Sequence, residues 1–133
     1  MEYLATLYRA AQLYAHNAHN LAHGPTFFED HEFLGELYGT YESAYDDLIE
    51  RLIGLGSPPD LLSIQTEAVN VLNSWGPCSD QQQCFAKLME VEARFVAEIE
   101  RIEDEYSAGT QNLLEGLADE SEKRTYKLRQ RLN

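Results

Sequence analysis

Apolar residues recur with a helical period along almost the whole chain. Between residues 4 and 22 they follow one another at steps of three and four, as expected for a helix with one buried face. These residues are Leu4, Leu7, Tyr8, Ala11, Ala15, Ala18 and Ala22. Gly24 and Pro25 interrupt the pattern and end this helix. A second, much longer helix is predicted from Thr26 to about Gly56, with Thr26 as its N-cap and Glu29 completing a capping box.

Three more helices are expected further along the chain. The first is short and apolar, from about Leu61 to Trp75, and lies in the connection between two longer helices. The next begins at a cap formed by Ser79 or Asp80, and the last begins at a cap formed by Thr110. No segment alternates with the two-residue period of a strand. The pattern therefore predicts an all-α four-helix bundle in which a long crossover, with its own short helix, joins the second and third long helices.

The composition agrees with one compact domain over residues 1–133. With 44% hydrophobic and 25% charged residues, the chain has enough apolar side chains to bury a core. It shows no apolar stretch long enough to span a bilayer and no targeting or lipidation signal, so we expect a cytoplasmic protein without a membrane partner. Cys78 and Cys84 fit neither a zinc knuckle nor a Cys-x-x-Cys redox motif. Reduced thiols are the expected state, and a local disulfide is the alternative.

The net charge of −13 argues against a nucleic-acid partner, because most of the surface would repel a phosphate backbone. Half of the ten basic residues nevertheless lie in the last eleven positions: Lys123, Arg124, Lys127, Arg129 and Arg131. A DNA-binding patch at this end is the less favoured interpretation. The favoured one is that these cations complement the negative end of a helix dipole and pair with Asp119 and Glu120 one turn earlier.

A run of carboxylates marks the third long helix. Its members are Glu90, Glu92, Glu98, Glu100, Glu103, Asp104 and Glu105. Carboxylate oxygens suit hard cations, so a surface lined by them would attract Fe²⁺ and nucleate a ferric mineral. Several of these residues are instead expected to form the solvated face of the helix.

Four residues stand out as candidate iron ligands: His19, His31, Asp46 and Glu50. The last three belong to one predicted helix, where a rise of about 1.5 Å per residue separates His31 from Asp46 by about 22 Å. Asp46 and Glu50 are one turn apart on one face, and His19 can reach His31 from the preceding helix. One metal ion cannot use both half-sites of the same chain.

Two copies of the chain would solve this problem. If the long helix pairs antiparallel with its copy about a two-fold axis near Thr40, each half-site meets its complement. Gly39 would allow the two backbones to approach closely there. The spacing therefore favours a homodimer as the smallest unit that completes the site.

At these residues the chain resembles a known family. The segment His19-Asn-Leu-Ala-His-Gly-Pro-Thr-Phe-Phe-Glu-Asp-His31 is similar to the signature of the Dps mini-ferritins, in which a His, a Gly and a Phe precede a second His twelve positions on. Similarity to the second and last helices of that family, and to the turn after the second, continues in residues 37–38, 45–51, 55–58, 109–114 and 122–129.

The resemblance implies a ferritin-like bundle that binds iron. By it, His19 and His31 are ligands from one subunit, and Asp46 and Glu50 are ligands from its dimer mate, at an intersubunit ferroxidase centre. It also implies peroxide as the oxidant, storage of Fe³⁺ in a hollow shell, and a cage of twelve subunits. The function predicted from the sequence is therefore Fe²⁺ oxidation and iron storage.

Two positions depart from the pattern of the family. Gly35 stands where the family usually has an Asp four residues after the second His, and Asn20 stands where it has a Trp. Glu32 and Glu36 flank Gly35, but they point about 100° and 140° away from His31 around the helix. Neither is a clean replacement for the missing carboxylate.

These departures leave alternatives open. The centre binds a second iron poorly, recruits His16 or His23, or is a relic in a catalytically silent ferritin-like scaffold or interaction protein. His16, His19 and His23 also share one helix face and could hold Zn²⁺, Ni²⁺ or Cu²⁺ without a partner subunit. A DNA-protecting Dps is the third and least favoured function, and no residue is assigned to DNA.

Overall fold

The computed structural model describes residues 1–133 and consists of five α-helices and one turn of 3-10 helix. The α-helices are α1 (Glu2–Leu21), α2 (Phe27–Gly54), α3 (Leu61–Trp75), α4 (Gln81–Ile102) and α5 (Ala108–Leu132). The 3-10 turn, η1 (Glu103–Glu105), joins α4 to α5. The predicted all-α bundle with an extra helix in the crossover is confirmed.

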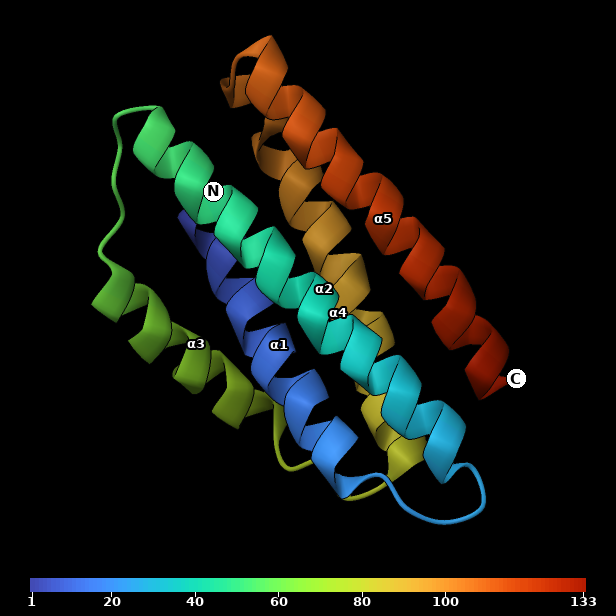
Figure 1. The fold of residues 1–133 in the computed structure, drawn as a ribbon. Helices are drawn as coiled ribbons and strands as arrows, with labels where there is room; N and C mark the ends of the chain where they lie inside the picture. Colours follow the sequence, from blue (N-terminus) through green and yellow to red (C-terminus); the bar gives the residue numbers. More distant parts are fainter.

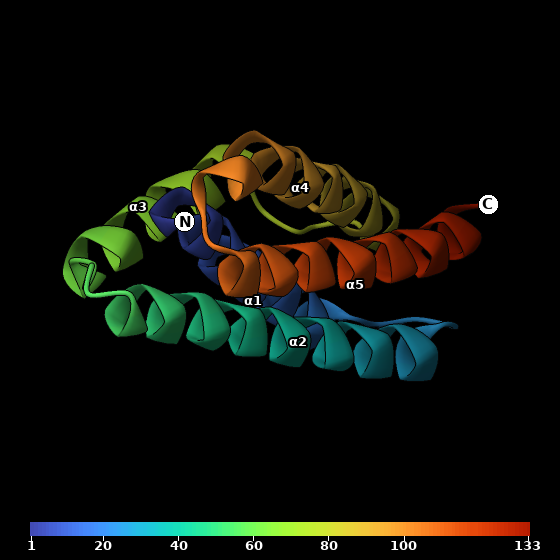
Figure 2. The same cartoon turned by 90° about the horizontal axis from the view of Figure 1, so that it is seen from above.

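Two antiparallel helical hairpins, α1–α2 and α4–α5, form the bundle (Figures 1 and 2). α1 packs against α2, α3 and α4, and α4 packs against α5. The crossover helix α3 therefore covers α1 on the side of the bundle away from α5 (Figure 1). α2 and α5 do not pack closely, which leaves one side of the bundle open between them.

The core confirms the apolar period in the sequence. All seven apolar residues of the first predicted helix are buried, and large side chains from all four long helices fill the interior, among them Tyr8, Tyr41, Phe95 and Leu114. The long second helix departs from its pattern at two positions, since Phe28 is 78% exposed and Ile53 is 52% exposed. Both lie on one stripe of α2, near its two ends, and are exposed in this chain.

The helices end near the glycine and proline residues that were predicted to stop them, but two of the predicted N-caps are not found. Asp60 and Asp80 cap α3 and α4 through hydrogen bonds from backbone N–H groups to their carboxylates. The predicted capping box at Thr26 is wrong, because its hydroxyl donates to the carboxylate of Asp30 at 2.8 Å instead. The prediction that Thr110 caps the last helix is also wrong, since α5 begins one turn earlier and buries this residue.

An ion pair, a hydrogen bond and a disulfide stabilise one end of the bundle. Arg131 of α5 binds both carboxylate oxygens of Asp30 on α2 at 3.0 Å. A third hydrogen bond joins Arg131 to Gln82 of α4. Cys78 and Cys84 form a disulfide, with their Cα atoms 5.6 Å apart, so the expectation of reduced thiols is wrong and the alternative holds. None of the helices is both long enough and apolar enough to cross a membrane.

Candidate functional site

His19 and His31 form a reciprocal pair where α1 ends and α2 begins. The Nδ1 atom of His19 lies 2.7 Å from the backbone carbonyl oxygen of His31, and Nδ1 of His31 lies 3.0 Å from the carbonyl oxygen of His19. The two rings stack with centroids 3.7 Å apart, and the ring of Phe27 stacks on the outer side of His31. The sequence prediction that His19 reaches His31 is therefore met, although by stacking and not by chelation.

These contacts define the protonation pattern of both imidazoles. A carbonyl oxygen only accepts hydrogen bonds, so Nδ1 must carry the proton in His19 and in His31. In the neutral ring the lone pair then resides on Nε2, which is the arrangement that metal-binding histidines use. Both residues are half-buried, so their rings are held by the protein and still reach the surface.

One ion cannot bind both rings as they stand. A metal binds imidazole in the plane of the ring at about 2.0–2.1 Å from the nitrogen. The planes of His19 and His31 are inclined by only 19° and their centroids are 3.7 Å apart, so no point lies near both planes at that distance. The pair can therefore present one nitrogen to each of two ions, or one nitrogen to a single ion.

Asp46 and Glu50 lie at the other end of α2. Both are exposed, and the unbroken helix between Phe27 and Gly54 keeps Asp46 about 22 Å along the axis from His31. No three His, Cys, Asp or Glu side chains of the chain come together as a metal site. The structure thus keeps the four candidate ligands in two separate groups within one chain.

The remaining candidate histidines have other contacts. His16 is exposed and stacks on the ring of Tyr38, with centroids 4.1 Å apart. Nδ1 of His23 donates to the carbonyl oxygen of Leu21 at the end of α1. With no three-ligand cluster in the chain, the alternative in which His16, His19 and His23 hold an ion by themselves is not supported.

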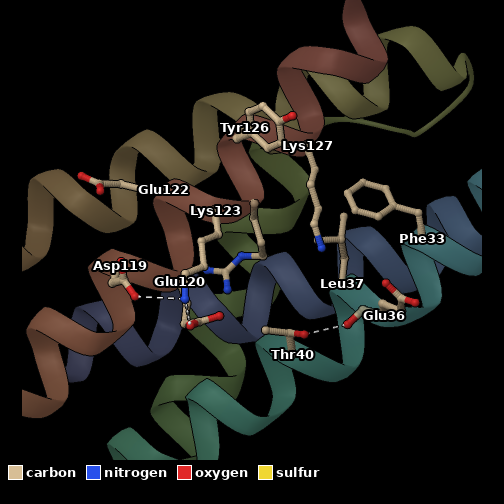
Figure 3. A pocket seen from close by; sticks show the side chains of 11 residues that line it. Phe33, Glu36, Leu37, Thr40, Asp119, Glu120, Glu122, Lys123, Tyr126 and Lys127 are labelled. Carbon is tan, nitrogen blue, oxygen red and sulfur yellow. Dashed lines mark hydrogen bonds and ion pairs between the residues drawn. The ribbon is translucent and has the colours of Figure 1, made fainter.

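Glu32 and Glu36 do not fill the gap left by Gly35. Glu32 is exposed. Glu36 lines the groove between α2 and α5 (Figure 3). His19 belongs to α1, which packs against α2. The groove has a volume of about 560 Å³ and is lined by charges of both signs. Part of that charge is neutralised within α5, where Lys123 pairs with Asp119 and Glu120.

A buried polar cluster, which the sequence did not reveal, lies where α1, α2, α4 and α5 meet. Glu92 is fully buried and accepts hydrogen bonds from Arg124 at 2.6 and 3.2 Å. Tyr41 and Ser121 each donate to the same carboxylate at 2.6 Å. Tyr8 completes the cluster, with its hydroxyl buried near the charges of Arg124 and Glu92. Glu92 is therefore the buried member of the acidic run, in which four of the other six residues are exposed as expected. The expected pairing of Arg124 with Glu120 one turn earlier is wrong, because Arg124 binds Glu92 instead.

Burial and charge shift the protonation equilibria of this cluster. Burial raises the pKa of Tyr41 well above its usual value, and it also raises the pKa of Tyr8. Burial alone would lower the pKa of Arg124, but the hydrogen bonds and the charge of Glu92 outweigh it and raise that pKa. Ferritin-like di-iron proteins place several carboxylates and histidines at such a position in the bundle. Here a guanidinium supplies the positive charge, so the bundle interior is not the candidate metal site.

Comparison with known proteins agrees with the family resemblance seen in the sequence. The sequence matches the ferritin-like domain family over residues 2–133. No curated protein shows significant similarity to the chain. Among solved structures, the crystal structure of the Dps protein from Vibrio cholerae O1, described as a member of a broad superfamily of ferritin-like diiron-carboxylate proteins, is similar with a TM-score of 0.70 and 22% sequence identity.

That alignment covers 99% of this chain and 86% of the Vibrio protein. At such low identity it establishes a shared fold, and the family match over nearly the whole sequence establishes descent. The chain belongs to the ferritin-like family.

Proposed function

We propose that this protein oxidises Fe²⁺ at a centre between two subunits and stores the resulting Fe³⁺. His19 and His31 of one subunit form one half of the centre, and Asp46 and Glu50 of the partner subunit form the other half. The observation that carries the proposal is the His19–His31 pair, because both rings have Nδ1 bonded to a carbonyl oxygen and Nε2 left for a metal.

The geometry of α2 supports a two-fold arrangement. At about 100° per residue, Asp46 and Glu50 lie about 60° and 100° around the helix from His31, so all three face the same half of its surface. Residues 31 and 50 have their midpoint between 40 and 41, as do 35 and 46. An antiparallel copy of α2 centred there brings each histidine end to a carboxylate end.

The centre of that arrangement has room for a second helix. Gly39 lies beside the midpoint, and a Cβ atom placed on it would meet nothing within 4 Å in this chain. Ile53 projects from the same stripe of α2 and is exposed. Without a Cβ atom at Gly39, the backbone of a second helix would be able to approach α2 closely at this point.

The ligand set suits the oxidation chemistry. Imidazole and carboxylate both bind Fe²⁺, and anionic oxygen stabilises the harder Fe³⁺ once it forms. With peroxide as the oxidant, two Fe²⁺ each give up one electron, and one H₂O₂ with two protons becomes two molecules of water. Peroxide and the hollow twelve-subunit shell are inferred from the resemblance to the Dps mini-ferritins.

The experiment is an anaerobic Fe²⁺ titration of metal-free protein, followed by addition of peroxide. Wild type is compared with the Asp46→Ala/Glu50→Ala double variant and with Asp47→Ala/Glu115→Ala, which removes the same charge from two exposed positions without ion pairs. We expect saturable binding and fast oxidation in wild type and in the control, and slow oxidation, as in free solution, in the Asp46/Glu50 variant. Equal, slow oxidation in all three proteins would refute the proposal.

The competing function is a catalytically silent ferritin-like scaffold. The observation in its favour is Gly35 in place of the carboxylate of the family. It predicts the same two-fold dimer by sedimentation, without any dependence of iron oxidation on Asp46 or Glu50. The titration described above therefore separates the two functions.

A further inference from the structure

Because Gly35 has no side chain, it leaves space beside α2 for the ring of His19. Resting on the proposed function, we propose that Gly35 is a positioning residue, which makes room for the ring of His19 against α2 and thereby orients both histidines for metal binding. On this view Gly35 does not mark a lost ligand. The reciprocal pair of His19 and His31 requires a residue without a side chain at this position.

The space around Gly35 is filled by His19. A Cβ atom built on Gly35 would lie 3.2 Å from Cε1 and 3.3 Å from Nδ1 of His19, closer than ordinary van der Waals contact. Of the other helical glycines, Gly39, Gly54 and Gly116 have nothing within 4 Å of such an atom, and Gly109 has only Nη1 of Arg51, at 4.0 Å. Only at position 35 does a side chain of a candidate ligand occupy the place of the missing Cβ.

One of the two ring atoms close to that place, Nδ1, also makes the key hydrogen bond. Nδ1 of His19 donates to the carbonyl oxygen of His31 at 2.7 Å, and that carbonyl lies one helical turn before Gly35. A side chain at position 35 would push the ring away from the backbone of α2 and lengthen this bond. Since the rings of His19 and His31 are stacked, the displacement would disturb His31 as well.

The consequence for metal binding follows from the tautomer. With Nδ1–H held by a carbonyl oxygen, Nε2 of each ring carries the lone pair. A His19 ring without this partner takes either tautomer, and the form protonated on Nε2 cannot bind a metal through that atom. Loss of such an orienting hydrogen bond typically lowers metal affinity about 10- to 100-fold.

The test compares Gly35→Ala, Gly35→Asp and the matched control Gly116→Ala in full-length protein. Each variant replaces a glycine inside a helix, which by itself changes helix propensity. Gly116→Ala controls for this effect, because the Cβ atom at position 116 would enter open space. Imidazole ¹⁵N shifts of metal-free protein report the tautomers of His19 and His31, and calorimetric titration with Co²⁺ alone reports metal affinity. Circular dichroism checks that each variant folds.

We expect both histidines of wild type and of Gly116→Ala to carry the proton on Nδ1. In Gly35→Ala we expect mixed tautomers at His19 and Co²⁺ affinity at least tenfold weaker, and we expect Gly35→Asp to bind no more tightly than wild type. Protonation on Nε2 in wild type would overturn the inference, as would unchanged tautomers in Gly35→Ala or tighter Co²⁺ binding in Gly35→Asp. Since the tautomers are read without metal, the inference can stand even if iron oxidation proves independent of Asp46 and Glu50.

Discussion

Replacing Arg124 by Met tests the buried cluster most directly. The Glu92 side chain is fully buried and that of Arg124 is only 10% exposed, so the substitution leaves a carboxylate inside the bundle with donors from Tyr41 and Ser121 alone. Breaking a buried ion pair by removing one partner costs about 3–5 kcal/mol. We therefore expect Arg124→Met to lower the free energy of unfolding at pH 7 by that amount.

A second substitution should partly reverse the loss. In Arg124→Met combined with Glu92→Gln, the amide oxygen still accepts from Tyr41 or Ser121, and no unpaired charge remains in the interior. We expect the double variant to be more stable than Arg124→Met by about 1–3 kcal/mol, since an uncompensated buried charge costs more than a neutral, hydrogen-bonded group. Neutralising a carboxylate would then stabilise the variant, although Glu92→Gln alone destabilises wild type.

The assay is equilibrium urea unfolding at a fixed protein concentration, because assembly shifts apparent stability. Lys123→Met is the control, since its ion pairs with Asp119 and Glu120 are at the surface and we expect no measurable change. A double variant less stable than Arg124→Met would refute the reasoning. So would a loss below about 1 kcal/mol for Arg124→Met.

Three further predictions concern the ends and the surface of the bundle. Burial alone would raise the pKa of Asp30, but hydrogen bonds from Arg131 and Thr26 outweigh it and lower that pKa. The ionised carboxylate therefore stabilises the fold above the unfolded pKa of about 3.9, and this stabilisation is lost as the pH falls through the lower folded pKa. Asp30→Asn should thus cost about 2 kcal/mol at pH 7 and less at pH 3, measured by urea unfolding; an equal cost at both values would contradict this. Reduction of the Cys78–Cys84 disulfide with dithiothreitol should lower unfolding stability by about 2 kcal/mol, the chain-entropy value for so short a loop, and an unchanged midpoint would contradict it. In gel retardation at physiological salt we expect no shift of plasmid DNA, and a salt-resistant shift would restore the DNA-protecting function.

The local spacing of apolar residues predicted most of the fold. The period of three and four residues in the first helix predicted which of its faces is buried, and all seven residues concerned are buried. The short crossover helix was predicted from Leu61 to Trp75 and has these bounds. Glycine and proline marked the helix ends well, because their backbone preferences act within a few residues. The cap at Thr26 failed because its hydroxyl donates to Asp30 in the first turn of the same helix, and the cap at Thr110 failed because that residue lies inside α5 and accepts a hydrogen bond from Arg51 of α2.

The candidate site was predictable only in part. Sequence spacing placed His19 beside His31, because a short loop joins the two helices that carry them. It gave no sign that the rings stack, that Nδ1 of each bonds to the other's backbone, or that Gly35 provides the space. Such contacts depend on the distance and rotation between two packed helices, and no periodic pattern within one helix contains that information.

The sequence by itself determined the helices, their order and the separation of Asp46 and Glu50 from His31. These properties follow from helical geometry, in which neighbours along the chain fix the rise and the rotation. Only the tertiary structure decided that Glu92 and Arg124, 32 positions apart, close the bundle interior with an ion pair. In the sequence each resembles one more charge on a polar helix face, because burial is decided by which faces meet when the hairpins pack and not by the local pattern.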